Sequence, residues 1–201
     1  MIESRHDDIF TRHDDGPVRH FDALILGSGF AGSTLAMVLA SQGMRTLVVD
    51  PKPHPRMSIG ESSTPLADGM LRYLARRYGL PLLERLSTYA GCQKLAGASP
   101  AGRPRVGLKR GFTYYQHHRG QSFREIRLGE QSMLIAASRS DAGGDTHWLR
   151  YDVDALLAQE AENRGAVMAA GFTLSDIERS SATRDARIRL VLKKETDAST
   201  T

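Results

Sequence analysis

The sequence predicts an α/β fold, and three observations near its beginning carry that prediction. A short, mostly apolar run at residues 21–26 has the length of a buried parallel strand. Residues 33–42 are rich in Ala and Leu and indicate a helix, with Gly43 as its stop. A second apolar run, RTLVVD at 45–50, ends in the acid Asp50. Strand, helix and strand in this order predict a parallel sheet with the helix packed against it.

A glycine-rich turn joins the first expected strand to the helix. It reads Gly27-Ser28-Gly29-Phe30-Ala31-Gly32, which is the G-x-G-x-x-G spacing. Gly27 permits the tight turn, Gly29 lets a pyrophosphate approach the backbone, and Gly32 allows close packing of helix on strand. The start of the helix offers free N–H groups and the positive end of its dipole to phosphates. Phe30 and Ala31 therefore join the three glycines as candidate cofactor-binding residues.

Asp50 stands about twenty residues beyond the glycine turn, at the tip of the second expected strand. A carboxylate there can accept hydrogen bonds from both hydroxyls of an adenosine ribose. An acid disfavours a 2′-phosphate, so FAD or NAD is favoured over NADP. Together these features predict a Rossmann-like, dinucleotide-binding βαβ unit.

Composition excludes several other classes of protein. The formal net charge of +4 is spread along the chain without a block of like charges, so we expect no nucleic-acid partner. No apolar run has the length of a membrane helix, and the N-terminus lacks the apolar segment of a signal peptide. The single cysteine, Cys92, allows no internal disulfide and is expected to be inert, which suits a cytoplasmic protein. The repeated RHDD at 5–8 and 12–15 lies in an expected mobile arm, and we expect no metal site.

The loop after Asp50 contains three prolines and the segment GESSTP, which exclude a regular helix or central strand. Thr64 as N-cap and Pro65 as the first helical residue predict that a helix begins here, with Asp68 near its positive end. Its apolar residues recur at helical spacing and are predicted to face the core. They are Leu66, Met70, Leu71, Leu74 and Tyr78.

The second half of the chain predicts mainly strands around one helix. Residues 105–118 alternate in polarity and predict one strand, whereas 129–147 reads as a loop with a strong turn at 141–145. Residues 148–166 predict a helix with Tyr151 or Asp152 at its N-cap. Short strands are then expected at 166–172, 173–180 and 186–194.

Four segments together resemble the flavin-dependent halogenases and their neighbours among the FAD-dependent monooxygenases. They are GSGFAG, VVD, SIGESSTP and VGLKRGFTYY. In the halogenases a Gly-Glu-small-Thr/Ser-x-Pro loop follows the second strand and lies near the flavin. The resemblance therefore implies that Glu61, Ser62 and Ser63 face the cofactor. A capping role for this loop, without cofactor contact, stays open.

The resemblance also implies roles for residues further along the chain. In the tryptophan halogenases a lysine of the corresponding strand region is catalytic, and Lys109 is the closest lysine here. An alternative alignment places that position on Arg105. Arg150 is implied as a flavin contact, with an exposed ion-pairing role equally open. Independently of the resemblance, His117 and His118 point to opposite faces if the expected strand continues, so one of them is a candidate base near the substrate. A pair at the end of a strand is the other interpretation.

The activity implied is that of an FAD-dependent oxidoreductase of the monooxygenase or halogenase type, using flavin hydroperoxide chemistry on a small organic substrate. A flavin reductase that supplies reduced flavin is the implied partner. A flavin-dependent reductase of isoprenoid double bonds, or a non-catalytic truncated nucleotide-binding module, stays open. A later Gly-Asp motif of the superfamily is not seen, so we expect an incomplete FAD/NAD(P)-binding fold. The expected domains are an arm at 1–20, the FAD-binding part with a partial substrate region at 21–194, and a polar tail at 195–201.

Overall fold

The computed structural model divides the chain into two compact units, residues 1–57 with 154–201 and residues 58–153. We call them unit 1 and unit 2. The structure describes residues 20–95, 104–124, 129–136, 138–179 and 188–194. Nearly all of the expected arm, both RHDD segments and the polar tail at 195–201 lie outside the described residues.

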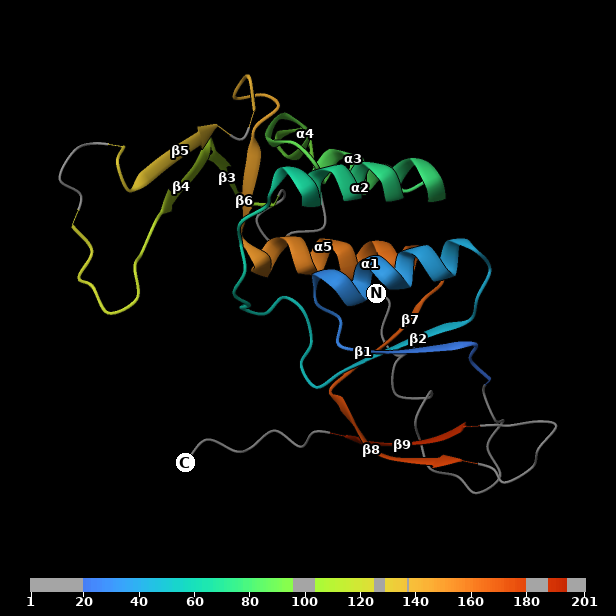
Figure 1. Cartoon of the computed structure of the whole chain (residues 1–201). Helices are drawn as coiled ribbons and strands as arrows, with labels where there is room; N and C mark the ends of the chain where they lie inside the picture. The colour runs from blue at the N-terminus through green and yellow to red at the C-terminus, as the bar shows by residue number, and fades with distance from the viewer. Residues whose placement is uncertain (1–19, 96–103, 125–128, 137, 180–187, 195–201) are drawn as a thin grey trace, which may run out of the picture. The chain divides into compact units, whose positions relative to one another are not determined.

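Unit 1 is built on three parallel strands in the order β1-β2-β7, shown in Figure 1. They are β1 (Ala23–Leu26), β2 (Thr46–Asp50) and β7 (Val167–Ala170). Every residue of the central strand β2 is buried, because it has neighbours on both edges and layers on both faces. This burial explains its unbroken apolar run, and the parallel sheet confirms the predicted fold class.

Two layers cover this sheet. Figure 1 shows α1 (Phe30–Ser41) and α5 (Arg150–Asn163) on one side, and the antiparallel pair β8 (Phe172–Arg179) and β9 (Ile188–Lys194) on the other. Leu47, Val49 and Ala169 pack with residues of β8 and β9. The boundary between the units falls inside α5, after Val153. The three strands expected in 166–194 are confirmed.

The helices of unit 2 are α2 (Pro65–Tyr78), α3 (Pro81–Leu86) and α4 (Tyr89–Gln93). Thr64 is the N-cap of α2, where its Oγ1 accepts from Ala67 N at 3.2 Å, as predicted. The predicted buried stripe is wrong in part, because Leu66 and Met70 are 80% and 52% exposed. The buried residues of α2 are Asp68, Leu71 and Ala75, so a carboxyl group faces the interior where Leu66 and Met70 were expected.

The strands of unit 2 form two antiparallel pairs, one of β3 (Val106–Lys109) with β6 (Asp145–Trp148) and one of β4 (Gly111–Tyr115) with β5 (Ser132–Ala136). The prediction of one strand over 105–118 is therefore wrong. The segment before Arg110 pairs with β6, and the segment after it pairs with β5. His117 and His118 lie beyond the end of β4. The loop expected over 129–147 contains β5 and β6 and is confirmed only around its turn.

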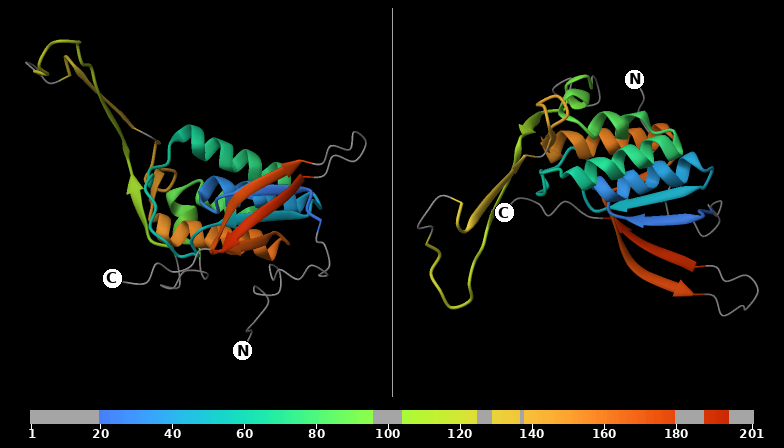
Figure 2. Two further views of the ribbon diagram at one scale, coloured as in Figure 1. Left: turned by 90° about the horizontal axis from the view of Figure 1, so that it is seen from below. Right: turned by 45° about the horizontal axis from the view of Figure 1, so that its top comes forward.

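The pair β4–β5 extends as a narrow ribbon away from the helices of the same unit (Figure 2). Apolar side chains on it are exposed, as in Tyr114, Tyr115, Met133, Leu134 and Ile135. No helix among the described residues is long and apolar enough to cross a membrane.

Candidate functional site

The glycine turn of unit 1 has the geometry that its spacing predicts. Gly27 has a φ of +99°, in the region that favours glycine, and its N–H donates to Val49 O at 2.8 Å. A Cβ on Gly32 would lie 1.9 Å from Gly27 O and 3.3 Å from Ile25 Cγ2. Only glycine fits at position 32, because the first turn of α1 rests directly on the end of β1.

The N-terminus of α1 follows directly on the glycine turn and has no side-chain cap. Gly29 is the N-cap and has no side chain to cap the helix. The first backbone hydrogen bond of the helix runs from Ser33 N to Gly29 O at 2.9 Å. Ser33 Oγ donates to Ser28 O at 2.8 Å and fixes the turn. This arrangement fits the pyrophosphate of a dinucleotide.

Asp50 lies buried at the end of β2, next to the glycine turn. Its Oδ2 accepts from Ser28 N at 2.7 Å, from Ser28 Oγ at 2.9 Å and from Arg56 Nη2 at 2.6 Å. Burial raises the pKa of Asp50, but the hydrogen bonds from Ser28 and Lys52 and the charge of Arg56 outweigh it and hold the pKa below its usual value. Asp50 is therefore ionised near neutral pH.

The other oxygen of Asp50 has room for a further donor. Oδ1 accepts only from Lys52 N, at 3.0 Å, among the residues that the structure describes. A carboxylate oxygen has two lone pairs, so a ribose hydroxyl can bind there without displacing a partner. The ribose role of Asp50 stays a prediction. Sequence reasoning missed Arg56 and also His54, whose Nε2 lies 2.8 Å from Ser28 Oγ.

In unit 2 the GESSTP loop lies along β6 and is held by its backbone. Trp148 N donates to Glu61 O at 2.7 Å, Ser62 bridges to His147, and Ser63 N donates to Thr146 O at 2.9 Å. The side chains of Glu61 and Ser62 are exposed, whereas that of Ser63 is buried and accepts from Thr146 N at 2.8 Å. The three predicted flavin-facing residues thus have different surroundings, and their contact with a cofactor stays a prediction.

Arg150 binds the same loop from the first residue of α5. Its Nη1 donates to Ile59 O at 2.7 Å and to Gly60 O at 3.3 Å. The predicted N-cap of α5 is wrong, because Leu149 O accepts from Asp152 N and the helix begins at Arg150. Whether Arg150 also contacts a flavin stays a prediction.

Lys109 lies in a buried environment at the end of β3. Its Nζ donates to Ser63 O at 2.5 Å and lies 3.7 Å from the centroid of the Phe112 ring. Burial lowers the pKa of Lys109, and the charges of Asp145 and Asp68 only partly oppose this effect. Lys109 is therefore closer to the neutral amine than a surface lysine is.

Arg105, the alternative to Lys109, has a different environment. Its guanidinium is mostly exposed and forms a bidentate ion pair with Asp152. The Nε donates to Oδ2 at 2.7 Å and the Nη2 donates to Oδ1 at 3.0 Å. Its backbone N also donates to Asp152 Oδ2 at 2.9 Å. Arg105 is thus a link between β3 and the start of α5, and a catalytic role for Lys109 stays a prediction.

Two buried acids beside Lys109 were missed by sequence reasoning. Asp145 is the cross-strand partner of Lys109 in the β3–β6 register, and Asp68 reaches the same place from α2. Burial and then the neighbouring Asp145 raise the pKa of Asp68 to about 7. Cys92 borders the cluster, with its Sγ 3.9 Å from Thr146 Oγ1, and burial raises its pKa, which supports the prediction of an inert thiol. The pairing of β3 with β6 brings Asp145 to Lys109, whereas Asp68 comes from α2.

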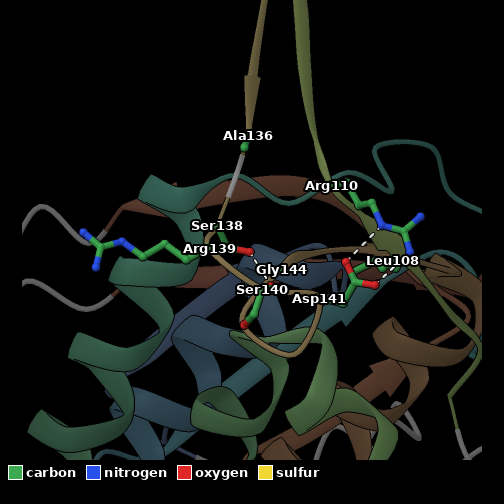
Figure 3. A pocket seen from close by; sticks show the side chains of 8 residues that line it. All are labelled: Leu108, Arg110, Ala136, Ser138, Arg139, Ser140, Asp141 and Gly144. Atoms are coloured by element: carbon green, nitrogen blue, oxygen red, sulfur yellow. Dashed lines mark hydrogen bonds and ion pairs between the residues drawn. The ribbon is translucent and has the colours of Figure 1, made fainter.

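Figure 3 shows a small cavity of unit 2. It has a volume of about 190 Å³ and lies beside the ion pair of Arg110 with Asp141, at 2.8 and 2.9 Å. Its other lining residues are Leu108, Ala136, Ser138, Arg139, Ser140 and Gly144. It is smaller than the usual range for organic ligands, so we assign no cofactor to it. Among the described residues, no cluster of three His, Cys, Asp or Glu side chains is arranged to hold a metal ion.

Comparisons with known proteins bear on this arrangement. Residues 22–199 match the family model described as FAD dependent oxidoreductase. The monodechloroaminopyrrolnitrin halogenase PrnC of Pseudomonas fluorescens is 35% identical over 146 residues, which are 73% of this chain and 24% of that protein. The tetracycline 7-halogenase of Kitasatospora aureofaciens is 30% identical over 168 residues, which are 84% of this chain and 28% of that protein.

Solved structures that resemble this chain include further halogenases. The crystal structure of halogenase PltM in complex with phloroglucinol and FAD has a TM-score of 0.63 and 27% identity, over 87% of this chain and 33% of that one. The myxobacterial chondrochloren halogenase CndH has a TM-score of 0.53 at 20% identity, over 87% of this chain and 35% of that one, and supports the fold alone. The chain thus spans about a quarter to a third of the length of these proteins.

Proposed function

Because the chain belongs to the FAD dependent oxidoreductase family and is homologous to flavin-dependent halogenases, we propose that it binds FAD and serves halogenation of a small organic substrate. The observation that carries this proposal is the hydrogen bond from Lys109 Nζ to Ser63 O. It joins the two segments, GESSTP and GLKRGF, that set the halogenase resemblance apart from a general nucleotide fingerprint. Both segments belong to unit 2.

The residues of unit 1 fit the adenosine and pyrophosphate parts of FAD. The backbone of Gly29, Phe30 and Ala31 would hold the phosphates at the start of α1, with Gly27 and Gly32 shaping the turn. Asp50 would accept a ribose hydroxyl at Oδ1. When bound and reduced, FAD supplies the chemistry that activates molecular oxygen and makes an oxidant for halide or substrate.

In this proposal Lys109 reacts with that oxidant through its Nζ. A neutral amine has a lone pair that can attack the halogen of hypohalous acid: the nitrogen–halogen bond forms as the oxygen–halogen bond breaks, and hydroxide leaves with an amine proton as water. An ammonium can only donate a hydrogen bond to the acid. Burial of Lys109 favours the neutral form because it removes the water that stabilises the charge. The carbonyl of Ser63 fixes the direction of Nζ in either case.

The test is an assay for a halogenated product. The protein is given FAD, a flavin reductase with NADH, oxygen, and chloride or bromide, with phloroglucinol as a phenolic probe. Mass spectrometry then detects the isotope pattern of the added halogen. We expect halide-dependent product that is lost in Lys109→Met, while Lys94→Met, which changes an exposed lysine, keeps it.

Other outcomes would contradict the proposal and indicate a different function. Oxygenated product without any need for halide would indicate a monooxygenase, and reduction of an added isoprenoid double bond would indicate a reductase. Failure of the protein to take up FAD, measured by its absorption spectrum after gel filtration, would indicate a module without turnover. FAD binding and halide-dependent product are separate measurements, so the two parts of the proposal are tested separately.

A further inference from the structure

Three charged side chains of unit 2 are buried together although they come from different elements. Asp68 on α2, Lys109 on β3 and Asp145 on β6 are 3%, 8% and 2% exposed. Buried charges are costly unless they are paired, and two acids with one base leave one negative charge uncompensated. The cluster therefore needs either a further cation or a bound proton.

The geometry ties the three groups to one another. The antiparallel register of β3 and β6 places Lys109 directly opposite Asp145, and the carboxyl groups of Asp145 and Asp68 lie within hydrogen-bonding reach. Ser63 links them, because its Oγ donates to Asp68 Oδ2 at 3.5 Å while its carbonyl accepts from Lys109 Nζ. Thr146 N holds that Oγ from β6 at 2.8 Å.

One oxygen of each acid is left without a donor. Asp68 Oδ1 and Asp145 Oδ2 are fully buried and have no hydrogen-bond partner among the described residues. Ionised carboxylates only accept hydrogen bonds, so two of them side by side repel each other. A single proton held between the acids removes one charge and gives a donor to the oxygens that lack one.

We propose that Asp68 and Asp145 share one proton near neutral pH and act as positioning residues that control the charge state of Lys109. The pair then presents one negative charge to the lysine, and it presents two when the proton leaves. A second negative charge stabilises the ammonium form, so the shared proton keeps the neutral amine accessible. The importance of Lys109 rests on the proposed function, whereas the shared proton stands on the cluster itself.

The charges that surround the pair agree with this assignment. Burial and the neighbouring Asp145 raise the pKa of Asp68 to about 7, and the Ser63 hydroxyl and the charge of Arg72 oppose the rise without cancelling it. Lys109 faces the pair from β3, and the thiol of Cys92 faces it from α4. Arg72 is held by Ser87 O at 3.1 Å, so its guanidinium is shared with another partner.

Infrared spectroscopy of protein labelled with ¹³C-aspartate tests the shared proton directly. A protonated carboxyl band is expected at about pH 5.5, between the ordinary Asp value of 3.8 and the Asp68 value of about 7. In the wild-type protein this band should disappear with a midpoint near pH 7. Its absence at about pH 5.5 would overturn the proposal without the need for any variant.

Two variants locate the proton. Asp68→Asn should remove the band, and Asp145→Asn should move its midpoint at least about one pH unit lower, because the repulsion between the acids is gone. An unchanged midpoint in Asp145→Asn would show that burial alone protonates Asp68 and would contradict sharing. Asp141→Asn, which changes an exposed acid of the preceding loop, is the matched control and should leave the band as it is.

The effect on Lys109 is measured by its reaction with an amine-specific reagent, followed by peptide mass spectrometry. Since Asp68→Asn fixes the pair at one negative charge, we expect Lys109 to react about tenfold faster at alkaline pH than in the wild-type protein. Lys94 serves as the internal standard for reagent exposure. Equal or slower labelling of Lys109 in Asp68→Asn would contradict the charge control. Neither measurement uses FAD or substrate, so a failed halogenation assay would leave this inference untouched.

Discussion

Lys109 and Ser63 are joined by a hydrogen bond from the lysine Nζ to the serine carbonyl at 2.5 Å. The same serine uses its N–H and its hydroxyl to bind Thr146 on β6. One residue of the GESSTP loop therefore fixes the loop to β6 and orients the lysine of β3. Any displacement of this loop also moves the amine that we propose to be reactive.

Replacement of Ser63 by Ala is expected to destabilise the protein. The change leaves Thr146 N without its acceptor and Asp68 without the hydroxyl donor, both in buried positions. A buried polar group that loses its partner costs about 1–3 kcal/mol. The free energy of unfolding from urea titration should fall by that amount. Ser62→Ala removes an exposed hydroxyl one residue earlier and should change it by less than about 0.5 kcal/mol.

Replacement of Gly32 by Ala is expected to disturb the turn before α1. The new Cβ would lie 1.9 Å from Gly27 O, so either the helix start or the turn must move. We expect a loss of more than about 2 kcal/mol in unfolding free energy, together with loss of FAD uptake. Gly69→Ala is the control, because a Cβ there meets nothing within 4 Å and the added methyl should stabilise α2 by up to about 1 kcal/mol. Similar unfolding curves for the two variants would contradict this account.

The nucleotide half of the molecule was predictable because its signal is local. The glycine spacing, the apolar strands and Asp50 lie within thirty residues of one another, and each has one physical role. The start of α2 at Thr64 and Pro65 was predictable for the same reason. Capping and turn chemistry depend on neighbours in sequence, which the sequence itself displays.

The buried cluster of Asp68, Lys109 and Asp145 was not predictable, because it depends on pairing between strands that are distant in the sequence. Alternation of polarity predicted one strand over 105–118, but β3 pairs with β6 and β4 pairs with β5 on either side of Arg110. The pairing of β3 with β6 places Asp145 opposite Lys109. Helical periodicity also misplaced the inner face of α2, because it assumes that apolar residues face inward, whereas Asp68 does so here.

Asp50→Asn is expected to weaken FAD binding. The substitution keeps the shape but removes the charge that Ser28 and Arg56 contact, and it replaces a strong acceptor for the ribose hydroxyl with a weaker one. Hydrogen bonds to charged groups contribute about 1.5–3 kcal/mol, so the Kd for FAD should rise at least about tenfold. Fluorescence titration of FAD measures this change. Asp22→Asn, which breaks an exposed ion pair with Arg45, should leave the Kd unaltered.

The stability of the protein should depend on pH through Asp68. Its pKa of about 7 in the folded state lies above the ordinary value of 3.8, so between these two values the folded protein binds more protons than the unfolded chain. Stability contributed by Asp68 is therefore fully present below about pH 4 and is lost as the pH rises through about 7. The slope is at most about 1.4 kcal/mol per pH unit, the value for one proton.

Urea titrations at a series of pH values measure this contribution as a difference between variants. Asp68→Asn should remove the decline between about pH 4 and 7, so that its unfolding free energy rises relative to wild type as the pH increases. Asp50 has the opposite sign, because its lowered pKa adds stability that is lost when the pH falls below its ordinary value of 3.8. The difference between wild type and Asp68→Asn isolates the buried acid from that second effect. Parallel stability curves for the two proteins would mean that Asp68 titrates as an ordinary carboxyl group.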